Sequence, residues 1–486
     1  MNNFHIKRFP VAVRRVFGSF FHLPSSIFHL SSAPRALRPS LRVFSSISFP
    51  LLLCFFRHPS SVIRHPSLLL CLLLLLTAAP AHADLAEHLG NLHPYISATG
   101  LYDSNLYLTQ DNTVSDFITT VTPGLKYKIE RPAYKFDLGF DLGFNFYASQ
   151  SELNYVSYNG RLDTFYSFTP RWTFRLLDTI TRSRNNLQSY SYASPGGPQT
   201  VTGSSSGQGL YIRNIFQPAL EYKFGRENLA ALMYSNMIYR TEGSTNSGDS
   251  TNNSITPSLT YWFNIRNGIA LDYTYTNAAF ESQPDWVGNN IGGRYLYRFN
   301  PRTTAYGDYR YTIRDFEFPG RDYSVHSPSL GLDHAFSPNL NGKAQFGWFW
   351  QLVDAGPSFN GPVINLSISH TLSVRTSYNV AFSSGYREQY FTTDNLGFSK
   401  YYQLQGGIKH QLRERLSTGL TGSLSRDDYQ APERTDYLYS VTGNVSYQPL
   451  KWLTAYLEAG NYGRESDLNG NSYRDNRAWL KLTAEY

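Results

Sequence analysis

The stretch Tyr134–Tyr147 reads YKFDLGFDLGFNFY, and its pattern indicates the fold. Every second position from Phe136 to Phe146 is large and apolar, while the positions between are charged, polar or very small. Successive side chains of a β-strand point to opposite faces, so the pattern predicts a strand with one apolar face. A membrane-crossing strand needs about 9 to 11 residues, with apolar side chains toward lipid and polar ones toward a wet interior. The stretch is long enough for this, although taken alone it also fits a long amphipathic strand of a soluble sandwich.

The same alternation recurs along the rest of the chain. The alternating runs are joined in turn by short connections rich in Pro, Asn, Gly and Arg and by longer polar loops. This regular order predicts an up-and-down antiparallel barrel, with tight turns on the periplasmic side and long loops outside. Nine short turns and ten longer loops give twenty strands, and large barrels of this class have about 16 to 22. The predicted fold class is therefore all-β, a single large transmembrane β-barrel.

The composition agrees with a membrane barrel. Tyr (37 residues) and Phe (32 residues) are abundant, and charged residues make up only 16% of the chain. The mean hydropathy of −0.37 argues against helical spans but not against a barrel, because half of each barrel strand is polar. A propeller is disfavoured, because its blades need four short strands, whereas each repeat here holds two long ones.

A single long apolar run, Leu68–Ala79, precedes the alternating region. It is followed by Ala81-His82-Ala83, which fits the small-residue cleavage pattern of a secretory signal peptide. We therefore predict cleavage between Ala83 and Asp84. A retained transmembrane helix is the less favoured alternative, because such a helix needs about 20 apolar residues.

The chain then divides into four parts. Residues 62–83 form the predicted signal peptide, residues 84–94 a short periplasmic lead, and residues 95–486 the transmembrane barrel. Residues 1–61 are rich in Ser, Pro, His and Arg, which is atypical of a signal peptide, and we attribute them to a translation start assigned too early. This organisation predicts an exported protein of the bacterial outer membrane.

Charge and cysteine content exclude several classes of function. Of the 43 basic residues, nine precede Asp84 together with no acidic residue, which leaves 34 basic against 36 acidic residues after the predicted cleavage. The basic excess belongs to the leader, so we predict no nucleic-acid binding. Both cysteines, Cys54 and Cys71, also precede Asp84. The exported part therefore has no disulfide framework and no thiolate metal site.

The sequence contains no catalytic, cofactor or metal motif, so we predict neither an enzyme nor a cofactor. Charged residues on the predicted inner face are the candidates for function, because inner charges bias ion passage or line a carbohydrate path. These pore-lining candidates are Lys126, Asp137, Asp141, Arg161, Asp163, Arg175, Asp272, Arg294, Arg298, Asp308, Arg310 and Arg314. The alternative is that the acidic members pair with the basic ones and only stabilise the barrel wall.

Proline residues and one long loop carry further predictions. A proline lies inside four of the strands, at Pro123, Pro218, Pro257 and Pro328. Because proline removes a ladder hydrogen bond, we predict a bulge or bend at each. Only the loop Ser183–Gln208 is long enough to fold inward as a constriction.

The chain ends on Tyr486 after an alternating run. A C-terminal strand that ends in an aromatic residue resembles the assembly signal of bacterial outer-membrane barrels. Pro94–Ser97 and Leu101–Asn105, with repeated Thr-Pro-x-Leu-x-Tyr strands, resemble the beta-barrel porin type 2 family of Gram-negative outer membranes. The resemblance covers Tyr95–Tyr486, carries no catalytic residues and implies a barrel channel; some relatives are associated with exopolysaccharide export.

Three functions fit these observations. The first is a passive channel for small polar solutes, with saccharides or anions as candidates, and the second is an outer-membrane component of exopolysaccharide export. The third, an outer-membrane lipid-modifying enzyme, is disfavoured because no Ser or His catalytic pair is evident. The expected partners are outer-membrane lipid and lipopolysaccharide, the barrel assembly machinery, and a small polar solute or polysaccharide. Nothing in the sequence specifies an oligomeric state.

Overall fold

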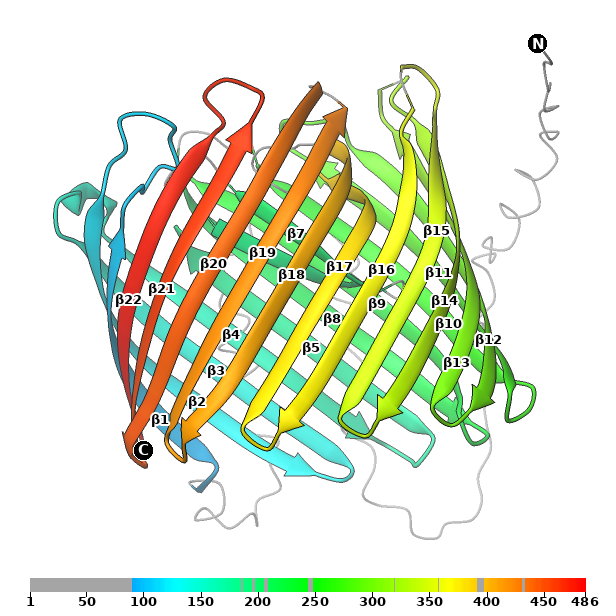
Figure 1. The fold of residues 1–486 in the computed structure, drawn as a ribbon, viewed down its shortest axis with the longest axis horizontal. Coiled ribbons are helices and arrows are strands. Elements are labelled where there is room, and N and C mark those ends of the chain that lie inside the picture. Colours follow the sequence, from blue (N-terminus) through cyan, green and yellow to red (C-terminus); the bar gives the residue numbers. More distant parts are fainter. Residues whose placement is uncertain are drawn as a thin grey trace, which may run out of the picture. The chain divides into compact units, whose positions relative to one another are not determined.

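Twenty antiparallel strands form one closed sheet, in which the last strand pairs with the first (Figure 1). The computed structural model describes residues 90–486, apart from residues 185–186, 195–196, 205–208, 244–247, 319, 357, 391–396 and 431–432. The predicted fold class and strand number are confirmed. The predicted leader, signal peptide and cleavage site between Ala83 and Asp84 lie outside the described residues.

The barrel strands follow one another around the wall in chain order. They are β1 (Leu92–Asp103), β2 (Asp116–Arg131), β3 (Tyr134–Tyr147), β4 (Tyr155–Ser167), β5 (Trp172–Ser183), β8 (Leu210–Phe224), β9 (Asn228–Glu242), β10 (Ser250–Trp262), β11 (Asn267–Phe280), β12 (Trp286–Asn300), β13 (Thr303–Phe316), β14 (Tyr323–Ser337), β15 (Leu340–Val353), β16 (Asn360–Ser373), β17 (Thr376–Gln389), β18 (Gly397–Arg413), β19 (Leu416–Gln430), β20 (Glu433–Leu450), β21 (Leu453–Ser466) and β22 (Tyr473–Glu485). A separate hairpin, β6 (Leu187–Ser194) and β7 (Gly197–Ser204), is inserted between β5 and β8, which pair directly. A short 3₁₀ helix, Ser151–Leu153, lies between β3 and β4.

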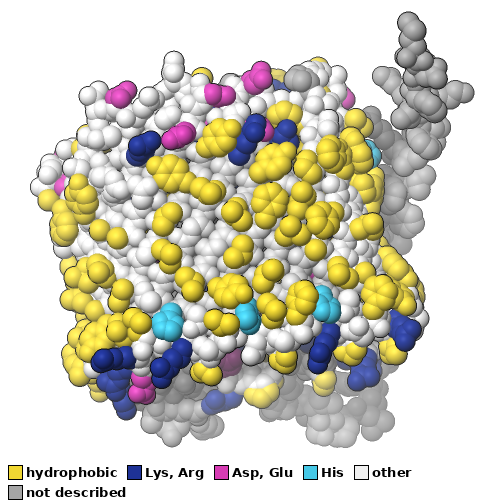
Figure 2. All heavy atoms as spheres, viewed as in Figure 1, with side chains coloured by type: hydrophobic (Ala, Val, Ile, Leu, Met, Phe, Trp, Pro, Cys, Tyr) yellow, Lys and Arg dark blue, Asp and Glu magenta, His cyan; other side chains and the backbone are white. Residues whose placement is uncertain are grey.

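The stretch that indicated the fold forms β3 along its whole length. Phe140, Phe144 and Phe146 are exposed on its outer face, whereas Lys135 and Asp141 contact polar side chains of neighbouring strands on the inner face. In a membrane barrel the exposed apolar face meets lipid. Figure 2 shows this arrangement on the visible face, where apolar side chains cover the middle and charged ones gather near the two rims. Among the described residues no helix is long and apolar enough to cross a membrane.

Five of the tight turns share one construction. In each, a side-chain oxygen accepts a hydrogen bond of 2.8 to 3.2 Å from the backbone N–H two residues further on, which fixes the turn. The accepting residues are Thr169, Asn264, Asn300, Ser337 and Ser373. In three of these turns the ladder skips the residue before the acceptor, namely Phe299, Phe336 or Leu372. Each skipped side chain is more than half exposed at the rim of the barrel wall.

The four strand prolines do not produce bulges, so the bulge part of that prediction is wrong, while the bend stays a prediction. Pairing of β2 with β3 resumes in the same register beyond Pro123, and the same holds on one side of Pro218, Pro257 and Pro328. On the other side each proline stays paired within an unbroken register. Proline lacks one N–H, so it interrupts the ladder toward one neighbour only. The register shifts occur next to the tight turns instead.

The barrel closes where β1 pairs with β22, from Tyr95 opposite Glu485 to Asp103 opposite Arg477. At the loop end of this seam the Arg477 guanidinium lies 3.2 Å from Asp103 and 2.5 Å from Asp475. These three side chains are almost completely buried. A buried charge is tolerated when it is paired and hydrogen-bonded, so the two aspartates and the arginine stabilise one another across the seam.

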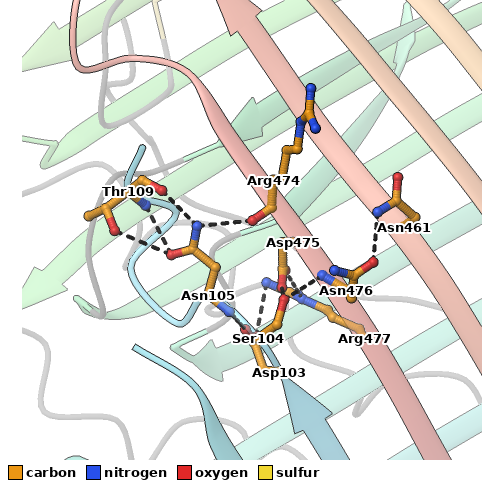
Figure 3. Close-up of polar contacts among 9 residues, drawn as sticks. All are labelled: Asp103, Ser104, Asn105, Thr109, Asn461, Arg474, Asp475, Asn476 and Arg477. Carbon is orange, nitrogen blue, oxygen red and sulfur yellow. Dashed lines mark hydrogen bonds and ion pairs between the residues drawn. The ribbon is translucent and has the colours of Figure 1, made fainter. Parts of the chain in front are cut away.

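Side chains outside this ion pair also join the first and last strands (Figure 3). The Ser104 hydroxyl donates to Asp475 at 3.1 Å. The Asn105 side-chain amide donates to the carbonyl oxygen of Arg474 at 3.0 Å and to that of Thr109 at 2.7 Å. Asn105 is fully buried and therefore couples the loop after β1 to β22.

Tyrosine rings of the inner face lie directly over glycines of a neighbouring strand. Tyr306 is paired with Gly331, and a Cβ added there would lie 2.1 Å from the ring carbon Cζ. Tyr95 and Gly124 form an equivalent pair, with a corresponding distance of 2.3 Å. The Tyr306 ring is covered on one face by the Arg294 guanidinium, 4.3 Å from the ring centre. Glycine is required at these positions because the ring occupies the space of a side chain.

Replacing Gly331 by valine should destabilise the barrel by about 1 to 3 kcal/mol, because the Tyr306 ring must leave its place over the strand. The urea unfolding midpoint in detergent micelles, followed by the heat-dependent shift in electrophoretic mobility, measures the loss. Gly139→Val is the control, since no atom lies within 4 Å of a Cβ added there. The loss should shrink when Tyr306→Ala is combined with G331V; equal losses at both glycines would contradict the steric account.

Candidate functional site

The predicted pore-lining residues of β11, β12 and β13 form one network. Arg294 lies 3.0 Å from Asp308, and Arg310 lies 3.4 Å from Asp308 and 3.7 Å from Asp272. The Asp308 side chain is nearly inaccessible to solvent between the two guanidinium groups. The structure thus brings together four of the residues that the sequence analysis selected.

A second group joins β3 and β4. Lys135 lies 2.8 Å from Asp163 and 3.9 Å from Asp137, and Arg161 lies 3.1 Å from Asp163. Lys135 was not among the predicted residues, although it lies only two positions from Asp137 on the same face. The two basic side chains share one carboxylate, so this group is also compact.

Asp141 is placed differently from the other acidic candidates. It accepts a hydrogen bond from the Tyr95 hydroxyl of β1 and another from the Asn159 amide of β4, both at 3.0 Å. No ion pair to Asp141 occurs among the described residues, and its partners are neutral. Asp141 therefore presents a hydrogen-bonded carboxylate to the inner face.

The remaining basic candidates pair with glutamates that the sequence analysis did not select. The pairs are Lys126–Glu485 (2.6 Å), Arg175–Glu221 (2.6 Å), Arg298–Glu227 (2.8 Å) and Arg314–Glu388 (2.7 Å). Glu227 lies in the turn after β8, and its hydrogen bond to Arg298 lowers the pKa of its carboxyl group. Each pair joins strands or turns that are far apart in sequence, so only the register of the barrel reveals it.

These ion pairs change what the inner face offers to a solute. A paired arginine and carboxylate present a dipole, whereas a free arginine presents a net charge. The arrangement agrees with the alternative role of stabilising the wall, and the role in selectivity remains a prediction. Among the described residues no group of three or more His, Cys, Asp or Glu could hold a metal ion.

The loop ends of β17 and β18 turn into the barrel. β17 pairs with β16 only as far as Ser384, opposite Ile364, while β17 and β18 stay paired beyond that point. There the rings of Tyr386 and Phe398 contact Phe349 of β15, which is fully buried. β15 is not a neighbour of β17 or β18 in the wall. The hairpin end has therefore left the wall and lies against the inner face of the barrel.

A hydrophobic cluster holds this hairpin end in place. Its buried members are Tyr323, Val325, Phe349 and Phe398, and Phe316, Val353, Phe359, Val363, Tyr386 and Tyr390 pack around them. Burying one large apolar side chain contributes about 1.5 to 3 kcal/mol. Several such side chains come from the hairpin end itself, so the contact is a small core on the inside of the barrel.

A polar contact joins the same hairpin end to β13. Glu388 lies 2.7 Å from the Arg314 guanidinium and accepts a hydrogen bond from the Tyr323 hydroxyl at 2.5 Å. The hydroxyls of Thr312 and Tyr386 lie 3.2 Å apart. Arg314 is only 5% exposed. The sequence analysis selected Arg314 but missed Glu388, because the polar pattern from Arg387 onward reads as a loop, whereas β17 continues to Gln389.

The β6–β7 hairpin also lies inside the barrel. Its strand β7 approaches β17, which stands opposite β5 and β8 in the order of strands around the wall. Figure 1 draws β7 between the near and the far wall. This contact agrees with the predicted inward fold of the loop Ser183–Gln208. The two inward elements, the β6–β7 hairpin and the end of β17–β18, therefore meet from opposite sides.

Comparison with known families supports the resemblance predicted from the sequence. Residues 285–486 match the family described as Putative beta-barrel porin 2. The match covers the C-terminal part of the predicted range. Among curated proteins, none matches the sequence.

The solved structures that match this chain share little of its sequence. The FrpB iron transporter of Neisseria meningitidis (F5-1 variant) is 8% identical, with 83% of this chain and 84% of that chain covered and a TM-score of 0.50. OccAB4 of Acinetobacter baumannii is 11% identical, with 82% and 98% covered and a TM-score of 0.40. OpdQ of Pseudomonas aeruginosa is 8% identical, with 82% and 99% covered and a TM-score of 0.38. At 8% identity the likeness to FrpB shows the fold alone, a large β-barrel.

Glu388→Gln should release the inward end of the β17–β18 hairpin. The change leaves the buried Arg314 without its counter-charge, and breaking a buried pair in this way costs about 3 to 5 kcal/mol. Cleavage by chymotrypsin after Tyr390 should therefore be faster in the folded variant than in the parent protein. Glu465→Gln is the control, because its pair with Arg474 is largely exposed and contributes little. Equal cleavage rates in all three proteins would contradict the proposed contact.

Proposed function

We propose that the protein is an outer-membrane channel through which small polar solutes, with saccharides and anions as the main candidates, diffuse passively. The observation that carries the proposal is a closed wall with charged, hydrogen-bonded side chains inside and exposed aromatic and aliphatic side chains outside. A polar inner face is suited to water, and an apolar outer face to lipid. Barrels of 16 to 18 strands already enclose an aqueous channel.

The size of the barrel supports a narrowed channel. Twenty strands spaced about 4.8 Å apart and tilted by about 40° give a backbone radius of roughly 20 Å. The strands β6 and β7 have eight residues each and span roughly 26 Å at about 3.3 Å per residue. That length is more than half of the distance across the barrel. The hairpin therefore obstructs part of the lumen, which favours small solutes over large ones.

Export and assembly complete the proposal. A signal peptide that is cleaved before Asp84 would direct export of the chain toward the outer membrane. Tyr486 is 94% exposed, while its backbone N–H donates to the Pro94 carbonyl oxygen at 3.0 Å. The terminal backbone is thus fixed to β1 while the ring remains accessible, which supports its recognition by the barrel assembly machinery. Outer-membrane lipid and lipopolysaccharide are the proposed neighbours of the apolar outer face.

Planar-bilayer recordings of refolded residues 84–486 test the channel. We expect stable conductance steps in the parent protein. Replacing residues 187–204 by a short Gly-Ser linker should increase the conductance on the order of twofold, because the hairpin no longer crosses the lumen. The wall should stay intact, since β5 and β8 pair directly along their length.

The heat-dependent shift in electrophoretic mobility serves as the control that both proteins are folded. Folded protein without any conductance would overturn the channel proposal. Equal conductance with and without residues 187–204 would instead show that the hairpin does not restrict the lumen.

A further inference from the structure

Basic residues ring the turn end of the barrel. Eight of the nine tight turns carry an exposed Lys or Arg, namely Arg131, Arg171, Arg226, Arg266, Arg302, Arg375, Arg415 and Lys451. In four turns the capping side chain binds the backbone N–H of the arginine itself, so Arg171, Arg266, Arg302 and Arg375 leave the turn at an equivalent position. In the part of the chain that the structure describes, none of these four forms an ion pair.

The inner wall beside this ring carries four further exposed cations. They are lysines of the strands, namely Lys223, Lys343, Lys409 and Lys481. Each is adjacent in sequence to a residue of the outer face, so its side chain lies on the inner face. None of the four forms an ion pair with another described residue. They differ in this respect from the paired pore-lining candidates, and the turn end of the lumen therefore carries an excess of positive charge.

The loop end carries the opposite charge. Exposed acidic residues without an ion pair to any described residue are Asp111, Glu152, Glu317, Asp354, Glu433 and Asp467. Several arginines at this end are neutralised, as in the pairs Arg387–Asp427 and Arg434–Asp436, both at 2.9 Å. Figure 2 shows mainly basic side chains along the lower rim of the visible face, and acidic side chains together with some basic ones near the upper rim.

We propose that the pore is electrically polar and takes polyanionic solutes at its turn end, the periplasmic mouth. The inference rests on the proposed channel function and specifies its solute and direction. Charges of one sign around a mouth raise the local concentration and arrival rate of solutes of the opposite sign. A solute with several carboxylates contacts several cations of the ring at once, which strengthens its capture. The acidic loops repel the same solute at the other mouth.

The spacing of the turns sets the salt range in which this polarity acts. Neighbouring turns lie two strands apart, which is roughly 12 Å along the wall. The Debye length is about 10 Å at 0.1 M salt and about 3 Å at 1 M. The fields of neighbouring turn cations therefore overlap at 0.1 M salt and are screened from one another at 1 M.

Current rectification measures the polarity directly. Both native cysteines precede residue 84, so N469C in the loop between β21 and β22 is a unique site for biotin, and added streptavidin reports which compartment the loops face. In 0.1 M KCl the current should be larger when the loop compartment is positive, since K⁺ then enters by the acidic mouth and Cl⁻ by the basic one. A current ratio on the order of twofold is expected, falling to one in 1 M KCl.

Variants assign the effect to the turn arginines. The quadruple variant R171Q/R266Q/R302Q/R375Q should lose most of the rectification. N339R places an arginine at the equivalent position of the fifth capped turn and should increase it. R321Q/R474Q removes two exposed arginines from the loop end as the control and should not reduce it. The heat-dependent mobility shift establishes that each variant is folded before it is recorded.

Oligogalacturonate, a chain of carboxylated sugars, serves as the polyanionic probe. Added to the turn compartment, it should block the current on the order of tenfold more often than from the loop compartment at 0.1 M salt. A neutral maltooligosaccharide should block equally from both sides. A conducting pore with symmetric current and side-independent block would overturn this inference and leave the channel function standing. Absence of conductance would overturn both the channel function and this inference. An unchanged current ratio in the quadruple variant would refute the role of the turn arginines.

Discussion

The structure depends on the pairing of its first strand with its last. Lipid offers no hydrogen-bond partner to a backbone, so an open sheet edge inside a membrane leaves a row of polar groups unsatisfied. The pairing of β1 with β22 removes that edge. Side chains at both ends of the seam strengthen it, with Lys126 reaching across β1 to Glu485 near the turns and Arg477 between two aspartates near the loops. Lys126, which the sequence analysis selected as a pore-lining candidate, and Arg477, which it did not select, therefore both help to close the barrel.

The alternation of apolar and polar residues in the sequence was sufficient to predict the strands of the barrel wall. It was insufficient to predict which side chains contact one another. Alternation within each run predicted the twenty strands and the lipid-facing side of β3, because one face of every strand must meet a single environment. The partner of Arg314 could not be predicted, since Glu388 lies on a hairpin that leaves the wall. Beyond Ser384 the hairpin end lies inside the barrel, and the polar pattern from Arg387 onward reads as a loop in the sequence. The missing bulge at Pro123 has a similar origin, because a neighbouring strand can accept the loss of one N–H without a change of register.

The charges of the barrel fall into two populations. Those of the middle wall, such as Arg294 and Asp308, neutralise one another and fix neighbouring strands. A second set at the turn end, which includes Arg302 and Lys343, has no such partner among the described residues. Selectivity by charge is therefore better sought at the mouths than along the wall. In the proposed channel the two inward hairpins limit the size of the solute and the turn end selects its charge, so different parts of the protein would carry the two tasks.

The residue skipped beside a capped turn has a consequence for how the barrel sits in its bilayer. Phe299, Phe336 and Leu372 take no part in the ladder pairing, and their side chains are exposed at the rim of the wall, where a membrane barrel carries its interfacial girdle. Exchanging such a residue changes the local hydrophobic height without moving any strand pair. A population of homologous barrels could thus adapt to membranes of different thickness through a few rim positions, while the geometry of the lumen stays constant.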